Sequence, residues 1–152
     1  MQTLKIQIPQ GYEIDSFDKL SGELKLKVQQ PKKEVTERIK TFDDVLQDNG
    51  IDFGHFDYDC NELADDEIAY RKLKLIAKSL NEGWTPDWSN SNEYKYFPWF
   101  EMRGSSGFRF DGYDYWNSGS YVGSRLAFKT SKLAEYAGKQ FQSIYEQFMI
   151  IK

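Results

Sequence analysis

Apolar and polar residues alternate in two short segments near the N-terminus. Leucine, isoleucine and valine occupy every second position of residues 4–8 and 24–28, with lysine and glutamine between them. This period of two predicts half-buried β-strands, and a proline follows each segment. The two strands can pair antiparallel, with Tyr12–Ser21 as a long irregular connection. Residues 1–30 are therefore predicted to form a β-hairpin.

Two segments in the middle of the chain have helical periodicity. In residues 34–50, Thr41 and Asp44 have the spacing of a weak capping box and Asn49-Gly50 is typical of a helix end, so a short helix is predicted. Over residues 65–83, apolar residues recur every three or four positions, which predicts a long amphipathic helix. Its apolar positions are Ala69, Leu73, Ile76, Ala77 and Leu80.

Residues 95–128 are predicted to form three successive strands. Lys95–Met102, Gly107–Tyr113 and Tyr121–Phe128 are rich in aromatic residues and are separated by turns of glycine, serine and asparagine. Short turns of this kind favour an antiparallel meander. Pro98 has no N–H to donate, which predicts an edge position for the first of these strands.

The last segment, residues 131–149, is predicted to be a helix with a wide apolar stripe, preceded by Thr130 or Ser131 as its N-cap. The stripe consists of Leu133, Tyr136, Ala137, Phe141, Ile144, Tyr145 and Phe148. The whole chain, residues 1–152, is thus predicted to be one domain of the α+β class. Its expected architecture is an antiparallel β-meander packed against two long amphipathic helices, with an N-terminal β-hairpin.

Charge and cysteine content narrow the classes of function. The net charge of −4 and the pI of about 5.1 argue against long-range attraction to nucleic acid or to anionic lipid, although a local basic patch stays possible. Cys60 is the only cysteine, so neither an internal disulfide nor a cysteine-based zinc cage can form. The N-terminus does not resemble a signal peptide, and no apolar run is long enough to span a bilayer. A soluble, cytoplasmic protein without membrane association is expected.

The acidic segment at residues 41–67 contains the strongest candidate for a metal site. Its central residues Asp57, Asp59 and Asn61 have the spacing of the first ligands in a calcium-binding loop. Glu62 stands where that loop needs glycine, and Ile68 stands where it needs a bidentate glutamate. His55, Asp57 and Cys60 would make a thin transition-metal shell. No metal is therefore predicted, and the segment is expected to be a solvated loop anchored by Phe53, Phe56 and Tyr58.

Residues for catalysis are scarce. His55 is the only histidine, so any Ser-His or Cys-His pair must use it. Neither a nucleophile elbow nor a phosphate-binding glycine loop is present. No catalytic residue and no cofactor is predicted, which favours a function other than catalysis. A site made of two carboxylates that meet in space remains an alternative.

Aromatic residues are concentrated in one third of the chain. Fourteen of them, including all four tryptophans, lie between Trp84 and Phe128. They either build the core and its lid or form a recognition face, since alternation forces some of them outward. Tyrosine, tryptophan and arginine dominate binding hot spots. The candidate binding residues are Tyr96, Trp99, Arg109, Tyr113, Tyr121 and Arg125.

Several tracts resemble an uncharacterised family of small proteins from bacteriophages, prophages and mobile elements of gut bacteria. These tracts are Asp66–Ile76, Leu80–Asn90, Tyr94–Phe100, Gly123–Lys129 and Leu133–Phe141. The resemblance is close over residues 66–148 and loose before them. It implies a phage or prophage origin and brings no activity with it. Two glycines in these tracts, Gly123 and Gly138, are predicted to stand where a side chain would obstruct packing.

The preferred hypothesis is a non-enzymatic accessory protein of phage or prophage origin that binds a host or phage protein through aromatic side chains. A nucleic-acid-associated role in phage replication is the main alternative. It requires a basic, aromatic face that involves Lys95, Arg109 and Arg125. The sequence leaves the oligomeric state open.

Overall fold

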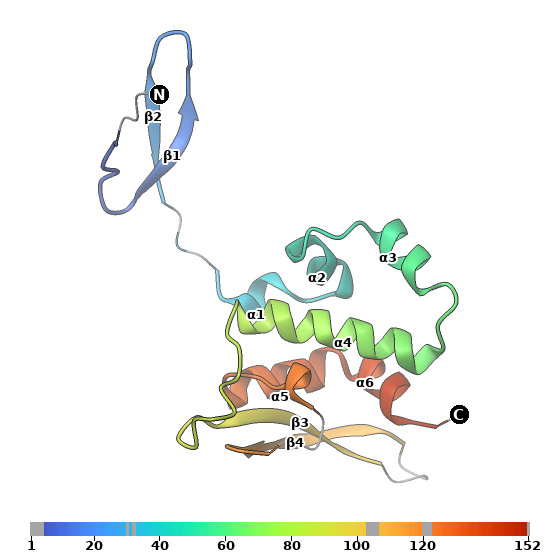
Figure 1. Ribbon diagram of the computed structural model, residues 1–152. Helices are drawn as coiled ribbons and strands as arrows, with labels where there is room; N and C mark the ends of the chain where they lie inside the picture. The colour runs from blue at the N-terminus through green and yellow to red at the C-terminus, as the bar shows by residue number, and fades with distance from the viewer. Residues whose placement is uncertain (1–4, 30, 32, 103–106, 120–122, 152) are drawn as a thin grey trace. The chain divides into compact units, whose positions relative to one another are not determined.

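A computed structural model describes residues 5–29, 31, 33–102, 107–119 and 123–151 of the chain (Figure 1). These residues belong to two compact units, residues 1–33 and residues 34–152. The predicted α+β class is confirmed, because the described residues form six α-helices and two small antiparallel sheets. None of these helices is long and apolar enough to cross a lipid bilayer.

The first unit is a β-hairpin made of β1 (Tyr12–Phe17) and β2 (Leu24–Val28). A hairpin is confirmed here, but its first strand is not the predicted one. Residues 5–8 have no regular structure, and the segment expected to be an irregular connection contains β1. The reason is local turn chemistry, which outweighs a good alternating pattern. The Asp18 carboxylate accepts hydrogen bonds from the Leu20 N–H and the Ser21 hydroxyl, both at 2.8 Å.

One face of this hairpin is apolar. Cross-strand pairing puts Tyr12 opposite Val28, Ile14 opposite Leu26 and Phe17 opposite Leu24. Of these six residues, all except Leu24 are exposed, with fractions from 37% to 62%. Two strands of this length are marginally stable on their own in water. Among the described residues of the first unit itself, no second layer covers this apolar face.

Three short helices open the second unit: α1 (Val35–Arg38), α2 (Phe42–Asp48) and α3 (Phe53–Cys60). The predicted capping box at the start of α2 is confirmed, because Thr41 Oγ1 accepts from the Asp44 N–H and the Asp44 carboxylate accepts from the Thr41 N–H. The prediction of a loop in the acidic segment is wrong, because α3 forms there. Asp52 caps α3 by accepting from the His55 N–H at 3.2 Å, a start signal that the sequence analysis missed.

The long helix α4 (Asp65–Asn81) confirms the helix predicted for residues 65–83. Its buried residues include all five of the predicted apolar positions. Three acids in its first turn suit the positive end of the helix dipole. The Glu67 carboxylate accepts from the Ala64 N–H, and Glu82 and Gly83 end the helix in left-handed backbone conformations.

The second sheet pairs β3 (Lys95–Glu101) with β4 (Arg109–Trp116), antiparallel, with an irregularity between Trp99 and Phe100. Tyr96 exchanges backbone hydrogen bonds with Phe128, so its N–H points away from β4. Pro98, two residues on, directs its nitrogen to the same side, where β4 requires no donor. This agrees with the predicted edge character of β3.

The third strand expected over residues 121–128 is not found in the described part of that segment. Residues 124–126 form a 3-10 helix, η1 (Ser124–Leu126), and only Phe128 bridges to β3. The side chain of Asn81 binds the backbone on either side of this bridge. Its amide donates to the Ala127 carbonyl at 2.8 Å and accepts from the Lys129 N–H at 3.0 Å. These two backbone groups point away from β3, because the N–H and carbonyl of Phe128, between them, both bond Tyr96.

The predicted C-terminal helix is divided into α5 (Ser131–Gln140) and α6 (Gln142–Met149). Thr130 is its N-cap, as one of the two predicted candidates. The helix breaks at Phe141, where the backbone leaves helical geometry. Immediately after the break, the Gln142 amide accepts from the Phe110 N–H at 3.0 Å and donates to the Phe108 carbonyl at 3.2 Å. The break thus coincides with two hydrogen bonds that satisfy the outer edge of β4.

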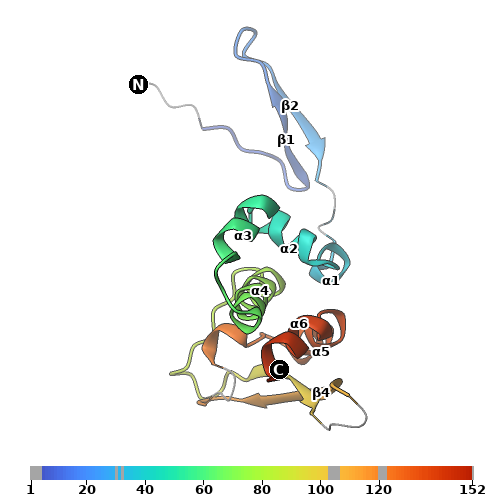
Figure 2. The same cartoon turned by 90° about the vertical axis from the view of Figure 1, so that its right-hand side faces the viewer.

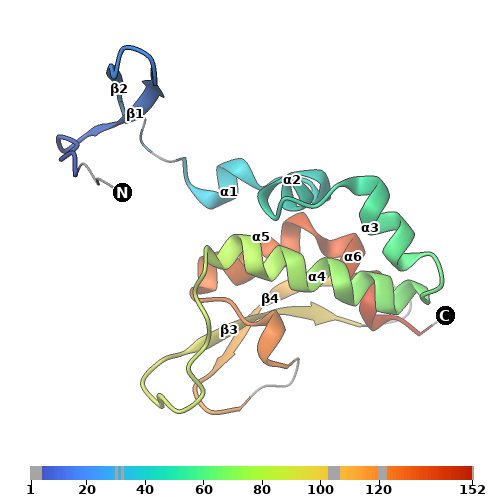
Figure 3. The ribbon, with the colours of Figure 1, turned by 45° about the horizontal axis from the view of Figure 1, so that its top comes forward.

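Within the second unit, the sheet forms one layer, α5 lies against it, and α4 lies between the C-terminal helices and α1–α3 (Figures 2 and 3). The core thus lies between α4, η1, the C-terminal helices and the sheet. Its most deeply buried members are Val45, Ile76, Leu80, Phe128, Ala134 and Ala137. The sheet is covered directly by α5, whereas α4 packs mainly on α6, α2, α5 and η1.

Candidate functional site

Several aromatic side chains of the second sheet remain outside the core. Trp99 and Trp116 are 53% and 52% exposed, and three tyrosines of the same region are between 41% and 49% exposed. These tyrosines are Tyr94, Tyr113 and Tyr115. The expectation that the aromatic residues exceed what the interior can hold is confirmed. Whether they bind a partner stays a prediction.

Four tyrosines, Tyr94, Tyr96, Tyr113 and Tyr115, form what we call the tyrosine cluster. Cross-strand pairing sets Tyr96 opposite Tyr115 and Pro98 opposite Tyr113, which places these side chains on one face of the sheet. The rings of Tyr94 and Tyr115 meet edge to face with centroids 5.0 Å apart. Tyr96 lies 5.9 Å from Tyr113 and 5.8 Å from Tyr115. Ring–ring contacts therefore hold the cluster in place before any partner arrives.

The predicted binding residues are divided between different surfaces. Tyr96 and Tyr113 meet in the tyrosine cluster, whereas Trp99, next to Pro98 in β3, points to the opposite face. Arg109 lies opposite Glu101 on that second face. Arg125 belongs to η1 and lines a groove elsewhere, and Tyr121 lies outside the described residues. No single face thus collects the predicted set among the described residues.

The charge of the exposed sheet is acidic. Arg109 forms ion pairs with Glu101 and with Asp111, the latter at 3.9 Å. Asp114 is also exposed on β4. Because Lys95 is buried and Glu101 is half-buried, the exposed charged residues of β3 and β4 are one base and two acids. This balance disfavours a polyanion as the partner of the sheet.

Lys95 does not belong to a basic face, which corrects the requirement of the nucleic-acid alternative. The side chain of Lys95 is completely buried. Its ammonium donates to the backbone carbonyls of Asp87, Asn90, Glu93 and Asn117, and it lies 3.2 Å from the Glu93 carboxylate. A buried ammonium has three N–H donors to satisfy, and these oxygens leave none of them without an acceptor. Lys95 therefore organises the loop between α4 and β3.

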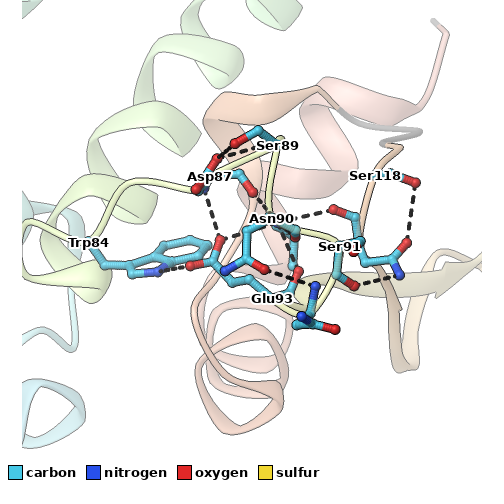
Figure 4. A network of polar contacts seen from close by, with 10 residues as sticks. Trp84, Asp87, Ser89, Asn90, Ser91, Glu93 and Ser118 are labelled. Carbon is cyan, nitrogen blue, oxygen red and sulfur yellow. Dashed lines mark hydrogen bonds and ion pairs between the residues drawn. The ribbon is translucent and has the colours of Figure 1, made fainter.

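Side chains of the same loop reinforce it (Figure 4). The Glu93 carboxylate accepts from the Asp87 N–H at 2.9 Å and from the Trp84 indole N–H at 3.3 Å. The Asp87 carboxylate accepts from the N–H and the hydroxyl of Ser89. The hydrogen bond from the Asp87 N–H lowers the pKa of Glu93, and the two bonds from Ser89 lower the pKa of Asp87. The network fixes Trp84 in place.

A groove of about 440 Å³ lies between this loop, α4 and η1. We call it the cationic groove, because its charged lining residues are Lys74, Lys78 and Arg125. Trp84 and Trp88 contribute its aromatic surface. This site was not among the predicted ones. The available signal was the four-residue spacing of the two lysines on one helical face, followed closely by two tryptophans.

The acidic segment contains no assembled metal site in the parts of the chain described. No group of three or more histidine, cysteine, aspartate and glutamate side chains converges there or elsewhere in those parts. His55 and Asp59 lie 3.8 Å apart on exposed turns of α3, whereas Cys60 is buried. Only Phe56 acts as the predicted anchor, through an edge contact with Phe42 at 5.1 Å. Phe53 and Tyr58 are 61% and 73% exposed, so the prediction that they anchor the segment is wrong.

The carboxyl groups with a displaced pKa are structural in their chemistry. Each has a pKa below its ordinary value, chiefly because neighbouring N–H and hydroxyl groups donate to it. They are Asp18, Asp44, Asp87 and Glu93. A general acid would need the opposite displacement. These four groups therefore give no support to a carboxylate enzyme.

Comparison of the chain with protein-family models, with curated proteins and with solved structures finds no match. The function must therefore be argued from the chemistry of its own surfaces.

Proposed function

We propose that the chain is a non-enzymatic accessory protein that binds another protein through the tyrosine cluster of the β3–β4 sheet. The observation that carries the proposal is the set of partly exposed rings at contact distance from one another, at Tyr94, Tyr96, Tyr113 and Tyr115. Tyrosine offers a large contact area with few rotatable bonds, so little side-chain entropy is lost on binding. Exposed aromatic patches of this kind usually mark interfaces.

The chemistry of the surrounding surface favours a protein over a nucleic acid as the partner. Arg109, the exposed base of the two strands, lies with Glu101 on the face opposite the tyrosine cluster. The cluster face of β3 and β4 thus offers no cation to a phosphate, whereas a protein with an apolar patch would be complementary to its rings. Tyrosine is also one of the residue types enriched among those that carry most of the binding energy of protein interfaces.

The apolar face of the N-terminal hairpin is a second surface that supports the same class of function. Ile14, Leu26 and Val28 expose between 37% and 62% of their area there. Such a face suits a protein partner, because the described residues of the first unit form no second layer of their own to cover it. A partner that covered it would also stabilise the pairing of the two strands.

The biological setting is part of the proposal. Resemblance over residues 66–148 supports an origin in a phage or prophage, which makes a host or phage protein the natural partner. The single cysteine and the acidic composition support a cytoplasmic location.

Affinity capture with matched variants tests the proposed function. The bait is the full chain, exposed to lysate of phage-infected or prophage-induced host cells, and the retained protein is then purified and titrated against the chain. Tyr113→Ser with Tyr115→Ser should weaken binding at least about tenfold, the effect of losing about 1.4 kcal/mol. Tyr58→Ser is the control, because Tyr58 is an exposed tyrosine on α3. A partner that binds both variants equally, or no partner at all, would refute the role of the cluster.

A further inference from the structure

The cationic groove concentrates positive charge in an acidic protein. Its lining includes Lys74 and Lys78 from α4 and Arg125 from η1, and it includes no aspartate or glutamate. The chain as a whole has a net charge of −4. Like charges gathered in one concave site repel one another, so the groove is electrostatically unfavourable when empty. An anionic ligand would relieve this repulsion.

The three cations have no neutralising neighbour among the described residues. Ion pairs elsewhere on the surface do not include any of them. The nearby carboxylates are held by other donors, Asp87 by Ser89 and Glu93 by the Asp87 N–H. Lys78 and Arg125 therefore keep their charges free for a ligand, and the Lys74 ammonium, which lies 5.0 Å from the centre of the Tyr70 ring, has no carboxylate partner among the described residues.

The second property of the groove is its pair of indole rings. Trp84 is fixed by the hydrogen bond of its Nε1 to the Glu93 carboxylate. The ring of Trp88 lies 5.4 Å from the buried ammonium of Lys95, which also holds the loop carbonyls together. Both rings are partly buried and both line the groove. They form a preorganised aromatic wall, which lowers the entropy cost of binding a flat ligand.

A neighbouring groove shows that this combination is specific to one site. It lies between α3 and α4, has a volume of about 480 Å³ and shares Lys74 and Lys78. Asp59 lines it, however, and Arg71 donates to the Asp59 carbonyl. It has no tryptophan. Of the two grooves, only the cationic groove combines three cations that lack a carboxylate partner with two indole rings.

We propose that the cationic groove binds a nucleotide, with its phosphate on Lys78, Lys74 and Arg125 and its base against Trp84 or Trp88. Phosphate pairs well with lysine and arginine, and every base has a face that stacks on an indole. A volume of about 440 Å³ suits a ligand of this size. Free nucleotides and the residues of a single-stranded nucleic acid share this chemistry. The site uses none of the tyrosine cluster.

Titration of the full chain with defined probes tests the inference. The probes are AMP, ATP, a 15-nucleotide oligothymidylate, adenosine and inorganic tripolyphosphate, followed by tryptophan fluorescence and calorimetry. AMP, ATP or the oligonucleotide should bind, and adenosine and tripolyphosphate should each bind at least about tenfold more weakly, because each lacks one half of the recognised chemistry. Oligonucleotide binding that falls steeply with salt, with AMP and ATP weak, would identify a single strand as the source. Tight ATP or AMP binding would identify a free nucleotide.

Charge-matched variants locate the site. Lys78→Gln with Arg125→Gln should weaken nucleotide binding by roughly ten- to a hundredfold, since two charge-assisted contacts are lost. Lys19→Gln with Lys132→Gln removes the same charge at exposed positions outside the groove and should change the affinity less than about twofold.

Because Lys78 and Arg125 are exposed, their replacement should leave the unfolding midpoint in place. Absence of binding by every phosphate-bearing nucleotide, or equal losses in both double variants, would overturn the inference. Tyr113→Ser with Tyr115→Ser should leave nucleotide binding intact, so this test is independent of the proposed protein partner.

Discussion

Gly138 of α5 lies directly against the ring of Phe110 in β4. A Cβ atom at Gly138 would stand 2.4 Å from Phe110 Cδ2, 2.6 Å from its Cε2 and 3.0 Å from the Cβ of Pro98. Real Cβ atoms do not approach other atoms this closely. The absence of a side chain at one helical position thus allows α5 to lie on the sheet.

Gly138→Ala is expected to destabilise the second unit by about 1 to 2 kcal/mol. Alanine favours the helix by about 1 kcal/mol over glycine, but overpacking costs about 1 to 3 kcal/mol, and three short contacts place this site at the upper end. Urea unfolding followed by far-UV circular dichroism measures the change.

Two companions separate the packing effect from helix propensity. Gly54→Ala in α3, where the nearest atom is the Asp52 carboxylate oxygen at 3.2 Å, should change stability by less than about 1 kcal/mol, because the gain in helix propensity offsets a small displacement of this N-cap oxygen. Phe110→Leu should make the Gly138→Ala change less costly than it is in the native background, because the two sites are in contact. Additive effects of the two substitutions would contradict the packing explanation.

Gly123 and Gly138 show how far a sequence pattern can predict a structural role. The expectation of a close approach is confirmed at Gly138 and wrong at Gly123, where a Cβ would meet no atom within 4 Å. Gly123 is required for another reason, its left-handed φ of +82°. Periodicity predicts that a residue is special, whereas the cause depends on partners that are distant in sequence.

Regular helices were predictable because their signals are local. The five apolar positions of α4 and the capping box of Thr41 and Asp44 follow from spacing alone. The register of the hairpin was not predictable, because the alternating pattern of residues 4–8 is as regular as that of a strand, whereas the turn at Asp18 decides which segment pairs. The third strand predicted for residues 121–128 was wrong in the described part of that segment, because η1 forms there and only Phe128 bridges to β3.

The candidate sites were less predictable than the fold. Alternation treats Lys95 as a solvent-facing residue, but four carbonyls that converge only in the folded chain enclose it. Exposure of part of the aromatic block was predictable, because alternation sends side chains to both faces of a sheet. The cationic groove combines residues from α4, the following loop and η1, and no local pattern joins all three.

Lys95→Met is expected to lower the free energy of unfolding by about 2 to 4 kcal/mol. Methionine fills a similar volume but gives no donor to the carbonyls of Asp87, Asn90, Glu93 and Asn117. Urea unfolding measures the loss, and the emission of the tryptophans should shift because Trp84 and Trp88 lie on this loop. Lys132→Met, an exposed lysine of α5, should change stability by less than about 0.5 kcal/mol. Equal effects of the two substitutions would show that the buried ammonium does not stabilise the loop.

Substitutions on the apolar face of the hairpin are expected to leave the second unit unchanged. Ile14→Ser with Leu26→Ser removes two exposed apolar side chains from the first unit, residues 1–33. Because residues 34–152 have their own core, their free energy of unfolding, measured in urea from the helical signal, should change by less than about 0.5 kcal/mol. A large shift would mean that the hairpin contributes to the stability of the larger unit.

Acid is expected to loosen the loop between α4 and β3, with a sign that follows from its hydrogen bonds. The pKa of Glu93 lies below its ordinary value of 4.5 and that of Asp87 below 3.8 in the folded protein. The unfolded chain therefore takes up protons first as the pH falls, and stability that is fully present above about pH 5 declines as the pH passes through the lower folded values. Asp44, whose pKa is lowered by the N–H groups of Lys40 and Thr41, contributes in the same direction from the capping box of α2.

Urea midpoints measured from pH 7 to pH 3 should fall most steeply below pH 5. Glu93→Gln should lower the urea midpoint at pH 7 and should reduce the fall of the midpoint below pH 5, because glutamine cannot titrate. The control, Glu62→Gln, changes an exposed position after α3 and should leave that fall unchanged. If Glu93→Gln followed the wild-type curve at every pH, the carboxylate would not be what ties Trp84 and the Asp87 N–H together.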